Sequence, residues 1–169
     1  PLLSLRRASP SARYPLPPLP MPPAPHAQPP SSSQFPIVRF TLNNLDGKPG
    51  QRGNIDVEVH ARWAPRGAAR FMELVGRDFF RGVRFFRVIP RFVAQFGIHG
   101  DPDVSSNWVD KNIQDDPVLE SNARGYLSFA ASGKNTRTTQ LFINFRDNQR
   151  LDSMGFAPFA RVLQGMDVV

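Results

Sequence analysis

Alternating apolar and polar positions begin at Ile37 and predict two β-strands. The run IVRFTL and the later run NIDVEVH place an apolar side chain at every second position, which is typical of strands buried on one face. The segment between them, NNLDGKPGQRG, is rich in Gly, Asn and Asp and predicts a turn. We therefore expect an antiparallel pair of strands.

A helix is predicted directly after the second strand. Pro65 suits its first turn and Gly76 suits its end. The residues expected to share its buried face are Ala68, Ala69, Phe71, Met72 and Val75. This spacing indicates a helix that covers a core with one face.

Five further apolar segments predict more strands. VRFFRVI and RFVAQFGI are separated by Pro90, and GYLSFAA, QLFINF and GFAPFARVL follow a long polar loop. One helix among about seven strands favours a mainly β fold, a closed or nearly closed β-barrel. The aromatic residues expected in its core are Phe79, Phe80, Phe85, Phe129 and Phe159.

The first 34 residues differ in composition from the rest of the chain. They hold 11 of the 18 Pro residues and no Asp or Glu. We predict a Pro-rich tail without fixed structure over residues 1–34, followed by a domain over residues 35–169. A linker or fragment end and a targeting remnant for an organelle or for secretion both remain open. The runs PLPPLP and PMPPAP are weak candidates for docking in a partner's aromatic groove.

The net charge of +7 does not identify a partner. A basic cluster consists of Arg66, Arg70, Arg77, Arg81 and Arg84. Glu73 and Asp78 interrupt it, so a solvated helix face is favoured over a phosphate-binding surface. We expect no nucleic-acid partner, since no recognisable binding module accompanies the charge.

Several classes of site are disfavoured by the sequence. The absence of Cys excludes disulfides and a thiol nucleophile. His26, His60 and His99 lack the spacing of a zinc site or a catalytic triad, and we expect no metal and no cofactor. No apolar run approaches the roughly 20 residues of a membrane-spanning helix, so we expect a soluble protein.

One basic residue stands among aromatic residues and glutamines. Arg87 follows two Phe residues, Gln95 belongs to the next predicted strand, and Gln140 and Phe142 share a face of a later one. These side chains would form an apolar cleft with a polar rim. The spacing equally allows an Arg exposed at the edge of the barrel.

Three ordered motifs favour the cleft. FFRVIPRFVAQFG, GYLSFAASGKNTRTTQLFINFRDNQRLD and FAPFARVLQGMDVV resemble successive blocks of the cyclophilin-type peptidyl-prolyl cis/trans isomerases, and they lie at suitable separations. The resemblance implies an antiparallel eight-stranded barrel closed by two helices. It also implies an enzyme that rotates X-Pro peptide bonds and assists protein folding.

The resemblance also implies roles for particular residues. Arg87 corresponds to the catalytic arginine, and Gln95 is expected to orient it. The residues expected to bind substrate are Phe92, Val93, Phe142 and Leu151 in a proline pocket, Gln140 on its rim, Ala130 and Ala131 beside the substrate backbone, and Phe156 as an apolar wall. Asn135 and Thr136 are expected to fix a neighbouring loop through local hydrogen bonds.

The sequence departs from the family pattern at the pocket. Val93 stands where Met is frequent and Ala131 where Asn is frequent, so we expect a shallower pocket that lacks one side-chain hydrogen bond. Many members carry Trp at the position of Arg150, and we therefore expect cyclosporin to bind weakly. Phe156 lies in a loop where many members carry His.

The expected partners are proline-containing peptides and unfolded or partly folded proteins, and we expect a monomer. A non-catalytic module that binds proline segments is the main alternative, and a basic docking protein that uses the tail is a weaker one. The family pattern continues beyond MDVV through a second helix and a last strand. We therefore expect this chain to be a C-terminally incomplete fragment of low stability.

Overall fold

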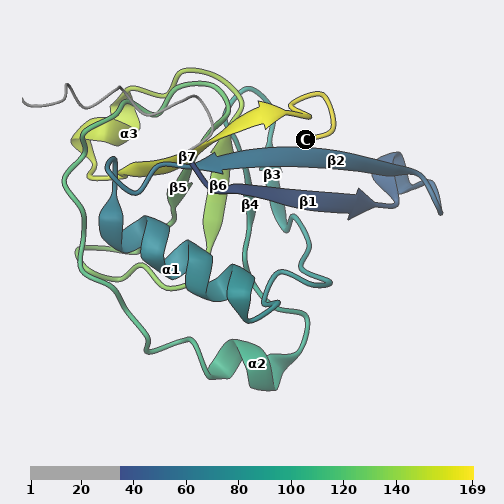
Figure 1. The fold of residues 1–169 in the computed structure, drawn as a ribbon, viewed down its shortest axis with the longest axis horizontal. Helices are drawn as coiled ribbons and strands as arrows, with labels where there is room; N and C mark the ends of the chain where they lie inside the picture. The colour runs from purple at the N-terminus through teal and green to yellow at the C-terminus, as the bar shows by residue number, and fades with distance from the viewer. Residues whose placement is uncertain (1–34) are drawn as a thin grey trace, which may run out of the picture. The chain divides into compact units, whose positions relative to one another are not determined.

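Antiparallel pairing links every strand of residues 35–169, the part of the chain that this computed structural model describes (Figure 1). The seven strands have the spatial order β1-β2-β7-β5-β6-β4-β3. They are β1 (Ile37–Asn43), β2 (Arg52–Val59), β3 (Arg87–Ile89), β4 (Val93–Phe96), β5 (Tyr126–Phe129), β6 (Leu141–Asn144) and β7 (Pro158–Gln164). The prediction of a mainly β, antiparallel fold is confirmed. The predictions for the tail and for His26 lie outside the described residues.

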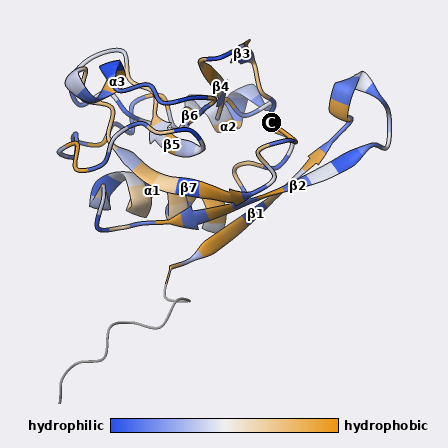
Figure 2. Cartoon of the chain, turned by 90° about the horizontal axis from the view of Figure 1, so that it is seen from above, coloured by the Kyte–Doolittle hydropathy of each residue, from blue (hydrophilic) through white to orange (hydrophobic). Residues whose placement is uncertain are grey.

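The first predicted strand pair is confirmed as the hairpin of β1 and β2. Its register runs from Ile37 opposite Glu58 to Asn43 opposite Arg52. Exposure alternates along β1, as the period of two predicted. A short 3₁₀ turn, η1 (Leu45–Gly47), lies in the connection, and Figure 2 shows this end of the hairpin as largely hydrophilic.

The sheet is curled but open. Within residues 35–169, β1 pairs only with β2 and β3 pairs only with β4, so the seven strands do not close into the eight-stranded barrel that the resemblance implied. β3 is also shorter than predicted. The Phe86 N–H still donates to the carbonyl of Gln95 over 3.1 Å, whereas Phe85 turns into the core and packs against Phe96 with ring centroids 5.1 Å apart.

Helix α1 (Pro65–Gly76) has the predicted bounds but a different buried face. Its buried residues are Gly67, Ala68, Phe71 and Leu74. Ala69 and Met72, which we expected on this face, are exposed. The reason is that Leu74 of this helix packs in a small buried cluster with Phe79 and Trp108. The buried stripe of the helix is therefore rotated about the helix axis relative to the predicted one. Residues 35–169 also contain two short helices, α2 (Pro102–Ser106) and α3 (Arg150–Ser153).

The main core lies between α1 and the concave side of the sheet. Phe71 on α1 packs against Phe159 on β7, and Phe159 packs against Phe129 on β5, with ring centroids 5.1 Å apart in both pairs. Phe80 and Phe85 pack against this core from its margin. These positions confirm the predicted aromatic core, although Phe79 belongs to the smaller cluster with Trp108.

A glycine allows the close approach of two segments at the end of β4. Gly97 has a φ of +105°, and a Cβ there would collide with the carbonyl oxygen of Thr139. The Thr139 hydroxyl in turn donates to the carbonyl of Gly97 over 2.8 Å. This contact sets the position of Gln140, which directly precedes β6.

None of the helices in residues 35–169 is long and apolar enough to cross a membrane.

Candidate active site

Three of the predicted site residues form one row across neighbouring strands. Arg87 on β3 lies opposite Gln95 on β4, and Gln95 lies opposite Phe142 on β6. Directly opposed residues of antiparallel strands project from the same face of a sheet. The sheet register therefore brings together side chains that are far apart in sequence.

Hydrogen bonds connect the two polar members of this row to each other and to Gln140, which directly precedes β6. Arg87 donates from Nη1 to Oε1 of Gln95 over 3.2 Å. Gln95 donates from Nε2 to Oε1 of Gln140 over 3.0 Å. Arg87 is exposed, and this is the one hydrogen bond that its side chain forms with residues 35–169. Its remaining N–H groups are therefore free to bind a ligand.

An apolar pocket lies beside the row and is separate from the main core. Val93, Phe142 and Leu151 form its buried base. Partly buried Phe92, Ala130 and Phe156 pack around them. The Phe142 and Phe156 rings meet edge to face with centroids 5.7 Å apart.

The pocket encloses a small cavity of about 160 Å³. Its lining contains every predicted site residue except Gln140: Arg87, Phe92, Val93, Gln95, Ala130, Ala131, Phe142, Leu151 and Phe156. Gln140 contacts the site through its hydrogen bond to Gln95. The lining combines an apolar floor with one guanidinium and one amide, which is the composition of a site for a small apolar group with polar neighbours.

A second set of residues holds the pocket from behind and was missed by the sequence analysis. Asn148 donates from Nδ2 to the carbonyl of Phe92 over 3.0 Å and to Oδ1 of Asn144 over 2.8 Å. The Phe145 N–H donates to the same Phe92 carbonyl over 2.9 Å. These bonds tie the turn that carries Phe92 to the loop after β6.

Asn122 holds the opposite wall. Its Nδ2 donates to the carbonyl of Phe156 and to Oδ1 of Asp152, both over 2.8 Å. Asn122 is fully buried, and such a polar side chain has to find partners inside the protein. The signal in the sequence was a set of polar residues, DNQRLD, around an apolar Leu151, but it did not show which loops these residues would join.

The pKa of the Asp152 carboxyl lies below its usual range. Burial opposes this shift, but three hydrogen bonds to the ionised form outweigh it. They come from the Ser121 hydroxyl over 2.6 Å, from the Asn122 backbone N–H over 2.9 Å and from its Nδ2. The carboxylate therefore serves as an anchor for the wall beside Leu151.

Local hydrogen bonds organise the neighbouring loop as predicted. The Thr136 hydroxyl accepts the backbone N–H groups of Ser132 and Gly133, each over 3.0 Å. The Asn135 Oδ1 accepts the Asp115 N–H over 2.8 Å.

In residues 35–169 no cluster of three His, Asp or Glu side chains is arranged to hold a metal ion.

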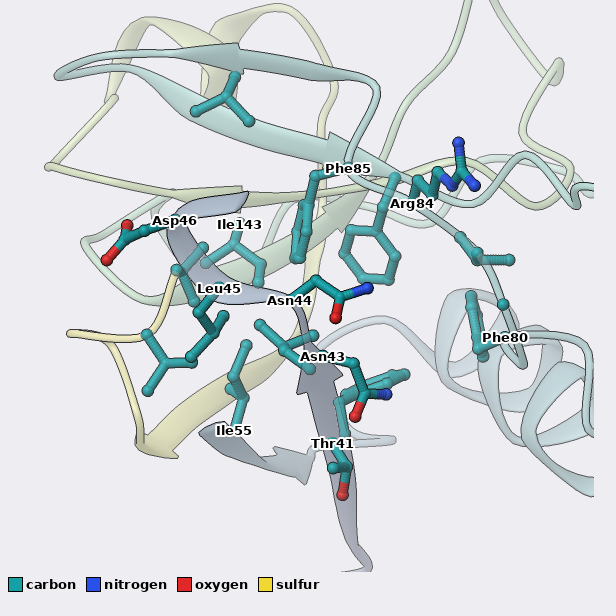
Figure 3. A pocket seen from close by; sticks show the side chains of 18 residues that line it. Thr41, Asn43, Asn44, Leu45, Asp46, Ile55, Phe80, Arg84, Phe85 and Ile143 are labelled. Carbon is teal, nitrogen blue, oxygen red and sulfur yellow. The ribbon is translucent and has the colours of Figure 1, made fainter. Parts of the chain in front are cut away.

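A larger cavity of about 650 Å³ lies elsewhere, between β1 and the β3 side of the sheet (Figure 3). Figure 3 shows Phe85, Ile143 and Leu45 gathered in it, while Arg84 extends from its margin. None of the predicted site residues lines this cavity. We therefore assign the site to the smaller cavity, which contains the hydrogen-bonded Arg87.

Comparison with known sequences identifies the family. Residues 48–169 match the model of the cyclophilin type peptidyl-prolyl cis-trans isomerases. A peptidyl-prolyl cis-trans isomerase of Acinetobacter baylyi is 35% identical over 127 residues, which are 69% of this chain and 65% of that protein. Peptidyl-prolyl cis-trans isomerase A of Dickeya dadantii is 36% identical over 123 residues, covering 69% of this chain and 64% of that protein. The chain thus spans just under two thirds of these relatives.

Solved structures share the fold. A cyclophilin type peptidyl-prolyl cis-trans isomerase of Cryptosporidium parvum superposes with a TM-score of 0.64 at 22% identity, over 79% of this chain and 81% of that one. A structure of the same protein in the presence of the dipeptide Ala-Pro gives a TM-score of 0.58 at 22% identity, over 69% and 76% of the two chains. On the family match and these identities, the chain belongs to the cyclophilin-type peptidyl-prolyl cis-trans isomerase family.

Proposed function

We propose that this chain catalyses cis/trans isomerisation of X-Pro peptide bonds and that Arg87 is its catalytic residue. The observation that carries the proposal is that Arg87, Gln95 and Gln140 are linked by side-chain hydrogen bonds at the rim of an apolar pocket. The family membership supports the same activity.

The chemistry of the reaction suits an arginine. Rotation about an X-Pro bond breaks amide resonance and has a barrier of roughly 18–20 kcal/mol. In the twisted transition state, the lone pair of the prolyl nitrogen is no longer delocalised into the carbonyl, and the carbonyl oxygen moves. A guanidinium is charged and rigidly forked, so Arg87 can donate to either atom without exchanging a proton. Gln95 orients Arg87, and its own bond to Gln140 holds the Gln95 amide in place.

The pocket provides the fixed end for this rotation. Val93, Phe142 and Leu151 would hold the proline ring, and Phe156 would close its side. The residue before the proline would lie along Ala130 and Ala131. No hydrogen bond to the Ala131 backbone forms within residues 35–169, so its N–H and carbonyl remain available to an extended peptide.

The proposed substrates are proline-containing segments of unfolded or partly folded proteins, whose folding the chain would assist as a monomer. The rim would discriminate against cyclosporin, because Arg150 places an exposed charge beside the pocket instead of a large apolar ring. A carboxylate partner is better suited to that position.

Exchange NMR on a short Ala-Pro peptide tests the activity, because it measures the interconversion rate directly. Arg87→Ala should lower kcat/KM about 100- to 1,000-fold, the usual effect of removing one donor to a transition state. Arg87→Lys should recover little of this, since an ammonium lacks the planar fork. Arg52→Gln, at an exposed position on β2 that lines neither cavity, is the matched control.

The alternative is a module that binds proline segments without catalysis. In that case the folded wild-type chain would shift the peptide resonances without accelerating exchange. Loss of exchange in Arg87→Ala with retained peptide binding would instead support the enzyme.

A further inference from the structure

Another cavity adjoins the proline pocket and is distinct from the 650 Å³ cavity described above; we call it the second cavity. It has a volume of about 490 Å³ and lies against α3 and the loop after β6. Phe92 and Leu151 line both cavities, so these two side chains form a shared wall. Ala130 and Ala131 line only the proline pocket. A peptide bound along these alanines would therefore leave the pocket across the shared wall.

The second cavity is positively charged. Arg146 and Arg150 line it, and both are exposed. Within residues 35–169, neither guanidinium forms an ion pair with a carboxylate. The single carboxylate in the lining belongs to Asp147, and one of its oxygens already accepts the backbone N–H of Arg124 over 2.9 Å. With Arg87 on the neighbouring rim, three arginines face one aspartate across the two cavities.

We propose that this cavity binds the residue after the proline and selects a Glu or Asp side chain there. The proposal rests on the proposed function, because the proline pocket sets the position of the peptide. A carboxylate that crosses the wall of Phe92 and Leu151 meets Arg146 and Arg150, and a guanidinium pairs with a carboxylate through two parallel hydrogen bonds. The substrates favoured by the chain are therefore X-Pro segments followed by an acidic residue.

The expected preference is modest because the arginines are exposed. Solvent-exposed ion pairs change an equilibrium constant by about 1.4- to 5-fold. We expect kcat/KM for a peptide with Glu after proline to exceed that of the Gln peptide by about two- to fivefold at low salt. The ratio should fall toward one near 1 M salt, where the screening length is about 3 Å.

The test compares four peptides by exchange NMR. Three have the form Ala-Ala-Pro-X-Ala, with Glu, Gln or Lys at X, and the fourth carries Glu two positions before the proline and Gln at X. The order Glu, Gln, Lys supports the proposal. Equal kcat/KM for the three, or a preference confined to the fourth peptide, would overturn it.

Charge reversal makes the assignment specific to this cavity. Arg150→Glu should favour the Lys peptide over the Glu peptide, and the double change Arg146→Gln, Arg150→Gln should bring the Glu-to-Gln ratio to about one. Arg52→Gln removes one positive charge from β2, away from both cavities, and should keep the wild-type ratio. An unchanged ratio in Arg150→Glu would contradict the proposal.

Failure of the two proposals can be told apart. If no peptide is isomerised, the proposed activity fails. Binding constants of the same peptides, from chemical-shift titration, then test the acidic preference independently. Equal binding of the Glu and Gln peptides would overturn the preference whether or not the chain is an enzyme.

Discussion

The side-chain amide of Asn148 donates a hydrogen bond of 3.0 Å to the backbone carbonyl of Phe92, although 56 positions separate the two residues. This bond joins the turn between β3 and β4 to the loop before α3. Phe92 is thereby held beside Leu151, and the two together form the wall between the proposed proline pocket and the cavity that contains Arg146 and Arg150. The shape of the site depends on a residue that does not contact the proposed proline ring.

Asn148→Ala should therefore weaken both stability and substrate binding. It removes donors to Phe92 and Asn144. The Phe92 carbonyl keeps the Phe145 N–H, but the buried Oδ1 of Asn144 loses its donor, so we expect a loss of about 2 kcal/mol in the free energy of unfolding. KM should rise severalfold, with a smaller change in kcat, because the pocket wall moves while Arg87 stays in place. Urea unfolding and exchange NMR measure the two effects. Asn112→Ala, at an exposed position, is the control, and an unchanged KM would contradict this role.

The lowered pKa of Asp152 predicts that the stability of the folded chain falls at acidic pH. Its pKa in the folded chain lies below the unfolded value, so ionised Asp152 contributes stability above the unfolded value of about 4, and this contribution is lost as pH falls through the folded pKa. Asp152→Asn should be less stable than the wild type at pH 7, and the difference should shrink below about pH 4. Urea unfolding from pH 3 to 7 measures it. A difference that is constant with pH would refute the assignment.

The buried carboxylate of Asp116, in the loop after α2, contacts both α1 and Arg137 in the loop between β5 and β6. The Asp116 carboxylate accepts the backbone N–H groups of Arg66 and Gly67 over 3.0 and 2.9 Å, and Nη1 of Arg137 over 3.1 Å. The Asp116 side chain is fully buried and that of Arg137 is 4% exposed. Asp116 and Arg137 therefore form an ion pair in the interior, and removing either residue would leave the other charge buried without its partner.

Asp116→Ala should lower the free energy of unfolding by about 3–5 kcal/mol, because it removes the carboxylate closest to a buried guanidinium. Arg137 would keep the carbonyl of Gln114 and a longer contact of 3.4 Å from Nε to Oδ1 of Asp115. The double change Asp116→Ala, Arg137→Met should cost less than the sum of the two single changes. Thermal or urea unfolding of the set measures the coupling, and strict additivity would show that the pair contributes no interaction. Asp110→Ala serves as the surface control.

The predictions from sequence succeeded where the physical cause is local or where a motif is long. Alternation along β1 follows from the pleat of a strand, and Pro65 and Gly76 mark the ends of α1 because of their backbone chemistry. The helix face was harder to predict. Ala69 and Leu74 are both compatible with an apolar stripe, and only packing against Trp108 selects Leu74.

The sequence by itself determined the strands, the bounds of α1, the family motifs and the residue types of the pocket, because backbone preferences and side-chain period act over a few neighbouring positions. The tertiary structure decided the contacts between distant loops: the polar network of Asn122, Asn148 and Asp152, and the second cavity that joins Phe92 to Arg150. A buried polar side chain has to find a partner, but composition does not specify which one. That choice depends on the register of the sheet and on the paths of the loops, which form only when the whole chain packs.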